Sequence, residues 1–453
     1  MTSLLIRGCE VVATMDDAGT EVAGGSILVR DGAIEWVGSG EPPSAADEVV
    51  DASGCVAIPG LVNTHHHLYQ VLTRARVQSG GLFRWLQELY PVWAGMDEEW
   101  TRTAASLGLA ELALSGCSTS TDHHYVFPAG AGDLLAAEID AAREVGVRFH
   151  PCRGSMDLGR SDGGLPPDSL AQDRDSILAE TEEAVARHHD PSPGSMLRIA
   201  VAPCSPFSVT PELMKESVAL ARRLGLRLHT HIAEALDEDD FCLERFGVRP
   251  IQLLEDLEFL GADVWLAHGV HLSDDDIARL AETGTGVAHC PSSNLRLASG
   301  IARVRALLDA GVPVGLGVDG SASNDSNDLL AEVRQAMLVA RAGMDPTALS
   351  AREALRIATR GGARCLGRDN EIGCLEPGKR ADVALFDITG LAFAGADGDP
   401  VAALAFCAPQ RVRDLFVDGR RVVADGRLTG ADEERLAADG HRVARRITDR
   451  AGG

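Results

Sequence analysis

Histidine and acidic residues stand at the ends of several short apolar runs in this sequence. The run 55–65 ends in His65 and is followed by His66 and His67, and later runs end in His231 and Asp319. Side chains alternate between the two faces of a strand, so His65 and His67 face one way and His66 faces the other. If these strand ends meet, three imidazoles and one carboxylate could bind a single divalent metal and leave positions open for water.

Two further residues beside this set could move protons. Glu234 follows His231 by three residues, in the loop after that run. A carboxylate there reaches a metal-bound water without binding the metal itself, which is what a general base requires. His268 lies near the end of another apolar run, 264–270. Together with Asp319, these residues predict hydrolytic chemistry at a metal centre.

The candidate residues can meet only if their runs form parallel strands of one sheet. Between residues 58 and 374, short apolar runs alternate with helical stretches rich in Ala, Leu and Arg, which is typical of β/α units. Eight such runs predict an α/β fold, a closed (β/α)8 TIM-type barrel whose active site lies where the carboxyl ends of the strands converge. The runs are 55–65, 117–122, 147–153, 197–204, 226–231, 264–270, 285–291 and 312–319.

The two ends of the chain have a different pattern. Residues 1–57 and 375–453 contain short β-like runs separated by turn residues, with Asp418-Gly419 as a hairpin signal. We therefore expect both ends to form one small β-sandwich domain and residues 58–374 to form the hydrolase barrel. A terminal helix is expected over 431–448.

The composition of the chain limits the kinds of partner that it can bind. The chain has 453 residues and a formal net charge of −25 at pH 7, which repels nucleic acid and anionic membrane surfaces. No run of eighteen apolar residues predicts a membrane span. The ten cysteines stand singly without a C-x-x-C pair, and the N-terminal residues lack the pattern of a signal peptide. These features predict a cytoplasmic enzyme that acts on a small molecule, and we expect a homo-oligomer.

The candidate metal ligands lie in motifs that resemble a known family. PGLVNTHHH (59–67), HTHIAE (229–234), LAHG (266–269), GLGVDGSASND (315–325) and CLEPGKRADVALFD (374–387) are similar to segments of the amidohydrolase superfamily. The resemblance extends over essentially the whole chain. Closer similarity, to the 8-oxoguanine deaminases in the branch of cytosine, guanine and triazine aminohydrolases, lies in HHHLYQVLTRA (65–75), LFRWLQELYPVW (82–93), DHHYVFP (122–128) and HCPSSNLRLASG (289–300).

This resemblance implies a mechanism. One divalent metal, Zn²⁺ with Fe²⁺ as the alternative, would be bound by His65, His67, His231 and Asp319. A metal-bound hydroxide would attack the substrate, and Glu234 would carry the proton of the water to a ring nitrogen. His268 would stabilise the tetrahedral intermediate, and Asp319 would help to protonate the departing ammonia. Two-metal relatives carry a modified lysine or another anionic residue on the fourth strand, but the run 197–204 has neither, so one metal is expected.

The resemblance favours 8-oxoguanine as the substrate, converted to urate and ammonia. Substrate contacts are predicted from Gln70, His123, Arg153, Cys204 and Asn294. Removal of an amine or chloride from a triazine, and deamination of guanine, isoguanine or a pterin, remain open alternatives. Opening of a cyclic amide is disfavoured by the missing fourth-strand lysine. A purely structural metal site is disfavoured because it would leave Glu234 and His268 without a role.

Overall fold

Eight parallel strands close into a barrel in the computed structural model, which describes residues 3–407 and 409–451. Their apolar sequences are buried almost throughout, because one face of each strand lines the barrel interior and the other is covered by helices. The expected (β/α)8 fold is confirmed. Around the barrel the strands are β10 (Arg148–Ser155), β11 (Ala200–Pro203), β12 (Leu228–Ile232), β13 (Val264–His268), β14 (Gly286–His289), β15 (Val314–Leu316), β8 (Leu61–Asn63) and β9 (Cys117–His124).

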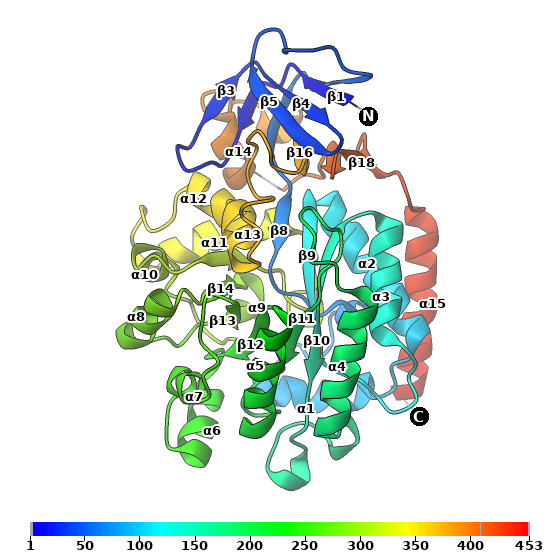
Figure 1. The fold of residues 1–453 in the computed structure, drawn as a ribbon, viewed down its shortest axis with the longest axis vertical. Helices are drawn as coiled ribbons and strands as arrows, with labels where there is room; N and C mark the ends of the chain where they lie inside the picture. The colour runs from blue at the N-terminus through cyan, green and yellow to red at the C-terminus, as the bar shows by residue number, and fades with distance from the viewer. Residues whose placement is uncertain (1–2, 408, 452–453) are drawn as a thin grey trace.

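The helices that follow the strands cover the outside of the barrel (Figure 1). Several begin at a side chain that accepts a hydrogen bond from the first turn, as Asp133, Thr210 and Ser273 do. The α-helices after the first one are α2 (Glu98–Leu114), α3 (Leu134–Val145), α4 (Arg174–His188), α5 (Pro211–Leu224), α6 (Leu236–Phe246), α7 (Pro250–Asp256), α8 (Asp274–Thr283), α9 (Pro291–Arg296), α10 (Val304–Asp309), α11 (Leu329–Ala340), α12 (Ala351–Arg356) and α13 (Gly362–Cys365). Short helical turns are η1 (Leu68–Thr73), η2 (Arg160–Asp162), η3 (Asp168–Leu170), η4 (Arg341–Gly343), η5 (Ile357–Gly361) and η6 (Leu391–Phe393).

Two smaller sheets lie at one end of the barrel and combine both ends of the chain (Figure 1). Ile6, Val12, Ile27, Val383 and Phe416 belong to the separate apolar core that these sheets share. The four-stranded sheet has the order β5 (Ala33–Ser39), β4 (Gly25–Arg30), β1 (Ser3–Arg7) and β6 (Glu48–Asp51). The seven-stranded sheet has the order β19 (Arg427–Leu428), β18 (Arg420–Ala424), β17 (Asp414–Val417), β16 (Val383–Asp387), β7 (Cys55–Pro59), β2 (Val11–Ala13) and β3 (Glu21–Ala23).

One expected strand is in fact two. The sequence predicts a single strand over 55–65 with the barrel starting at residue 58, but β7 pairs with β16 in the seven-stranded sheet and only β8 enters the barrel. The two strands meet at Gly60, where a Cβ atom would lie 2.4 Å from the Cβ of Ser118. This close approach of β9 requires glycine at the point where the chain passes from the sheet into the barrel.

Two features of the C-terminal segment agree with the sequence. Asp418 and Gly419 have φ of 55° and 76°, and Val417 pairs with Arg420, so they form the expected two-residue hairpin turn. The terminal helix α15 (Glu433–Ala451) begins two residues later than expected and packs against α2, with α14 (Pro400–Phe406) preceding the last strands. In the described ranges, every helix is too short or too polar to cross a membrane.

The helix α1 (Leu82–Trp93) lies at the end of the barrel opposite the two small sheets (Figure 1). One of its faces carries Leu82, Trp85, Leu86 and Tyr90, and these four side chains line a cavity with residues from the barrel strands. The cavity therefore lies at the carboxyl ends of the strands, where barrels of this type build their active sites.

Candidate metal centre and active site

Five side chains predicted to do chemistry converge at the carboxyl ends of four strands. His65 and His67 follow β8, His231 lies on β12, His268 ends β13 and Asp319 follows β15. The Nε2 atoms of His65 and His67 lie 3.3 and 3.4 Å from Asp319 Oδ1. All five residues are buried.

His67 and His231 face each other with unprotonated nitrogens. Their Nδ1 atoms each lie 2.7 Å from a backbone carbonyl oxygen, of His123 and Cys204 respectively. A carbonyl oxygen only accepts, so each Nδ1 carries the proton and each Nε2 carries a lone pair. The two Nε2 atoms are only 3.0 Å apart. Burial holds the pKa of both imidazoles well below the ordinary value, so a proton does not relieve this repulsion.

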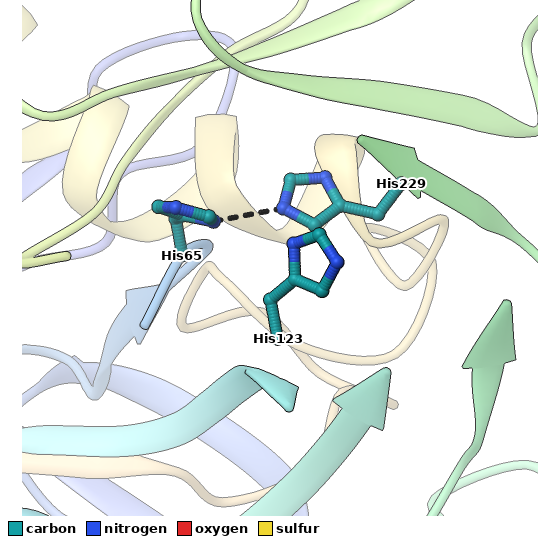
Figure 2. Close-up of side chains that lie close together, drawn as sticks. All are labelled: His65, His123 and His229. Carbon is teal, nitrogen blue, oxygen red and sulfur yellow. Dashed lines mark hydrogen bonds between the residues drawn. The ribbon is translucent and has the colours of Figure 1, made fainter. Parts of the chain in front are cut away.

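His65 supplies a third lone pair through its contact with His229. The Nδ1 of His229 donates to the Trp265 carbonyl oxygen at 2.7 Å, which leaves its Nε2 to accept from His65 Nδ1 at 2.8 Å. Figure 2 shows these two rings joined, with His123 beside them. The Nε2 of His65 is therefore unprotonated, and among the described residues it meets no hydrogen-bond donor.

Asp319 completes a set of four electron-pair donors. Its Oδ1 accepts from the Gly320 amide at 2.7 Å, and its Oδ2 accepts from the hydroxyls of Ser293 and Ser323 at 2.6 and 3.2 Å. Three donors to one carboxyl group favour its ionised form. Three imidazole lone pairs and one carboxylate that converge without a proton among them fit a divalent cation.

Glu234 lies beside this set, at the cavity. Its Oε2 is 3.4 Å from His268 Nε2, and its side chain lines the cavity. Burial raises the pKa of Glu234 to about 7.

The buried carboxylate of Glu238 accepts from the amides of Ala233 and Glu234, both at 2.9 Å, and so holds the turn in which Ala233 has a φ of 51°. Such strained backbone persists where surrounding contacts impose it.

His268 is oriented by Asn294. The His268 Nδ1 donates to Asn294 Oδ1 at 3.0 Å, which turns Nε2 toward Glu234 and Asp319. Burial alone would lower the pKa of His268, but these two carboxylates raise it above the ordinary value. Asn294 was expected to contact the substrate; the structure instead places it behind His268, outside the residues that line the cavity.

The other predicted substrate residues divide into two groups. Gln70 and Cys204 line the cavity, and neither amide atom of Gln70 has a hydrogen-bond partner within the described ranges. His123 stacks on His231 with ring centroids 4.7 Å apart, and it does not line the cavity. Arg153 is not brought to the cavity: its side chain pairs with Glu180 of α4 at 2.7 Å. Neighbours along a strand face opposite ways, and Arg153 lies on the side of β10 that faces the helices.

The cavity itself is small and mostly apolar. Its free volume is about 30 Å³, enough for roughly two water molecules. A bicyclic substrate therefore enters only if side chains move aside. Beyond the residues already described, the lining consists of Tyr125, Phe207 and Leu297.

Sequence reasoning missed residues that hold the site together. His229 lies two residues before His231 on the same strand, so the alternation of side chains already placed both inside the barrel. Glu238 lies on α6, and nothing in its local sequence distinguished it from an ordinary helical residue.

Comparison with known proteins agrees with this geometry. The sequence model of the amidohydrolase family matches residues 56–422. The chain belongs to the amidohydrolase family. It is 49% identical to an 8-oxoguanine deaminase of Pseudomonas aeruginosa, over 94% of this chain and 95% of that protein. It is 39% identical to a hydroxydechloroatrazine ethylaminohydrolase of a Pseudomonas species, over 99% of this chain and 96% of that protein.

Solved structures extend the similarity to three dimensions. A crystal structure of an atrazine chlorohydrolase from Arthrobacter aurescens, complexed with zinc, matches with a TM-score of 0.93 and 35% identity, covering 97% of this chain and 100% of that one. The family and enzyme class expected from the sequence, a hydrolase of the amidohydrolase family, are therefore confirmed.

Proposed function

We propose that this amidohydrolase deaminates a purine-like heterocycle, with 8-oxoguanine converted by water to urate and ammonia. The proposal rests on three unprotonated imidazole nitrogens that lie close together beside Asp319. Glu234 and His268 lie at the edge of this group. The 49% identity to an 8-oxoguanine deaminase over nearly the whole chain supports the choice of substrate.

The proposed metal ligands are His65, His67, His231 and Asp319. A divalent ion held there supplies Lewis acidity and lowers the pKa of bound water toward 7. Zn²⁺ suits three imidazoles and one carboxylate, and Fe²⁺ is the alternative. A single ion is proposed because β11, with the sequence AVAP, offers neither lysine nor carboxylate to bridge a second one.

Three side chains would move protons. Glu234 accepts a proton from the attacking water and delivers it to a ring nitrogen, which makes the adjacent carbon more electrophilic. His268 orients the water and stabilises the negative charge of the tetrahedral intermediate through Nε2. Asp319 assists proton transfer to the amino group, which leaves as ammonia.

The position of Asn294 gives a test of the role of His268. Replacing Asn294 by Ala leaves the buried Nδ1–H of His268 without its acceptor, which costs about 1–3 kcal/mol. If this cost falls on the transition state, where His268 acts, kcat should fall about 5- to 150-fold. KM should change little, because Asn294 does not line the cavity. Steady-state kinetics separate the two parameters, and elemental analysis should find the metal content unchanged. An effect confined to KM would instead make Asn294 a substrate contact.

Substrate choice is tested by comparing two purines. The 8-oxo group adds a carbonyl and an N–H to guanine, and a selective pocket must pair both, since a buried unpaired group costs about 1–3 kcal/mol. Gln70 lines the cavity, and its buried amide meets no hydrogen-bond partner among the described residues, so Gln70 is the residue proposed to bind such a group. We expect kcat/KM for 8-oxoguanine to exceed that for guanine by at least about tenfold, measured from urate and xanthine absorbance.

Equal values, or a preference for guanine, would remove 8-oxoguanine and leave the deaminase proposal intact. Triazine hydrolysis is the second candidate, favoured by the TM-score of 0.93 to a zinc-complexed atrazine chlorohydrolase. Rapid amine release from a melamine-type triazine, with no turnover of either purine, would transfer the proposal to that reaction. An isoxanthopterin deaminase is also 37% identical, so a pterin belongs in the same screen.

A further inference from the structure

A second group of buried ionisable side chains lies beside the cavity, outside the proposed metal site. Asp122 and His124 are on β9 and Glu138 is on α3. All three are fully buried, and one nitrogen or oxygen atom from each lies within 4.8 Å of the others. The mechanism proposed above uses none of them, so their burial requires another explanation.

The contacts of the three side chains are specific. Asp122 Oδ1 accepts from the Leu68 amide at 2.5 Å. His124 Nδ1 lies 2.6 Å from Glu138 Oε1, and His124 Nε2 lies 3.0 Å from the Val126 carbonyl oxygen. One oxygen atom of Asp122 lies within 4.8 Å of one oxygen atom of Glu138. In the described part of the protein, Asp122 Oδ2 and Glu138 Oε2 have no hydrogen-bond partner, so they can pair with each other only if one of them carries a proton.

These contacts determine where the protons lie. The Val126 carbonyl only accepts, so His124 Nε2 carries a proton. Burial lowers the pKa of His124 to about 4, so its ring is neutral and Nδ1 has a lone pair that must accept from Glu138 Oε1. Burial also raises the pKa of Asp122 and Glu138 well above the usual range. Protons on both carboxyl groups would complete the set, with Glu138 Oε1–H donating to His124 Nδ1 and Asp122 Oδ2–H donating to Glu138 Oε2.

The result is one hydrogen-bonded chain in which every donor has an acceptor. It runs from the Leu68 amide through Asp122, Glu138 and His124 to the Val126 carbonyl, and it carries no net charge.

Both ends of this hydrogen-bonded chain of side chains lie next to residues that line the cavity. Leu68 directly follows His67 and begins η1, which carries Gln70. The backbone of β9 holds the same segment from its other side, since the His123 amide donates to the His66 carbonyl at 2.7 Å and the His123 carbonyl accepts from His67 Nδ1 at 2.7 Å. At the far end, Val126 follows Tyr125, which lines the cavity.

We propose that Asp122, Glu138 and His124 form an uncharged hydrogen-bonded chain that positions His67 by anchoring the amide of Leu68. The three are positioning residues, and the inference rests on the proposed metal site, in which His67 is a ligand. Residues that orient a ligand from behind in this way commonly change metal affinity by about 10- to 100-fold when they are removed.

Amide variants separate this proposal from a structural or metal-binding role. Asp122→Asn keeps the acceptor for Leu68 and donates an N–H to Glu138, and Glu138→Gln accepts from Asp122 and donates to His124. Both should retain Zn²⁺ within about threefold of the wild type in competition with a chelator. Asp122→Ala removes the anchor and should lose about 10- to 100-fold in Zn²⁺ affinity. The readout is zinc transfer to the chelator, with the melting temperature of the metal-free protein measured in parallel.

Asp414→Ala is the matched control. Asp414 is also a fully buried carboxylate, but it lies on β17 in the small sheets and pairs with Arg413 and Arg421. Its loss should lower the melting temperature and leave Zn²⁺ affinity unchanged. His67→Ala, which removes a proposed ligand outright, gives the upper limit of the effect.

Several outcomes would overturn the inference. One is a folded Asp122→Ala variant that holds Zn²⁺ as tightly as the wild type. If that variant does not fold, a tenfold loss of Zn²⁺ affinity in folded Asp122→Asn or Glu138→Gln would also overturn the inference. A second zinc ion in the wild type that is absent from these two variants would overturn it as well. A wild-type protein that binds no zinc would instead overturn the proposed metal site itself, on which the inference rests.

Discussion

Replacing Glu234 by Gln should lower kcat by at least about 10²-fold and leave the metal content unchanged. Glutamine keeps the size of the side chain but cannot accept a proton from water. Burial raises the pKa of Glu234 to about 7, so near neutral pH the native carboxyl group can both take up a proton and release it. Ammonia release under saturating substrate measures kcat, and elemental analysis measures the metal.

A neighbouring acidic residue provides the control for this variant. Asp237 is exposed on the first turn of α6, and Asp237→Asn should keep full activity. If Glu234→Gln remains active at full metal occupancy, Glu234 is not the base. If the variant loses the metal, Glu234 acts as a ligand, and the four-ligand site proposed here is wrong.

The sequence predicted the barrel and the convergence of the site because both follow from a repeated pattern. Eight apolar runs, each ending in a turn, allow few folds, and the carboxyl ends of parallel barrel strands necessarily meet. His231, His268 and Asp319 could therefore be brought together without knowledge of any distance. The order of the two small sheets did not follow in the same way, since β7 pairs with β16 more than 320 residues away.

The residues that sequence reasoning misplaced depend on details of register and rotamer. Arg153 lies near the end of β10, as His123 does near the end of β9, but His123 pairs with Cys152 and Arg153 pairs with His124. This difference of one residue in register turns the Arg153 side chain from the barrel interior to the helices. Asn294 lies on α9, and only its 3.0 Å contact with His268 shows that it faces a histidine rather than the cavity. Protonation states were likewise inaccessible, because each depends on which carbonyl oxygen lies beside a ring nitrogen.

Removing the metal should abolish activity and destabilise the fold together. The lone pairs of His67 and His231 face each other across 3.0 Å, and that of His65 faces Asp319 at 3.3 Å, so the site is strained electrostatically without a cation. Lewis acid assistance contributes several kcal/mol to such reactions, so chelation should lower kcat by at least about 10³-fold. Zinc at 1,000 times its dissociation constant should add about 4 kcal/mol to the free energy of unfolding.

The experiment combines elemental analysis, activity and thermal unfolding of the same samples. We expect about one divalent ion per chain in the purified protein. The chelated protein should melt at a lower temperature, and Zn²⁺ should restore both stability and activity. His67→Ala should resemble the chelated protein and should not respond to Zn²⁺, because one of the four donors is gone. His189→Ala, which changes a half-buried histidine remote from the barrel interior, is the control and should bind the metal normally. Two ions at high occupancy would contradict the single-metal site, since β11 supplies no residue to bridge them.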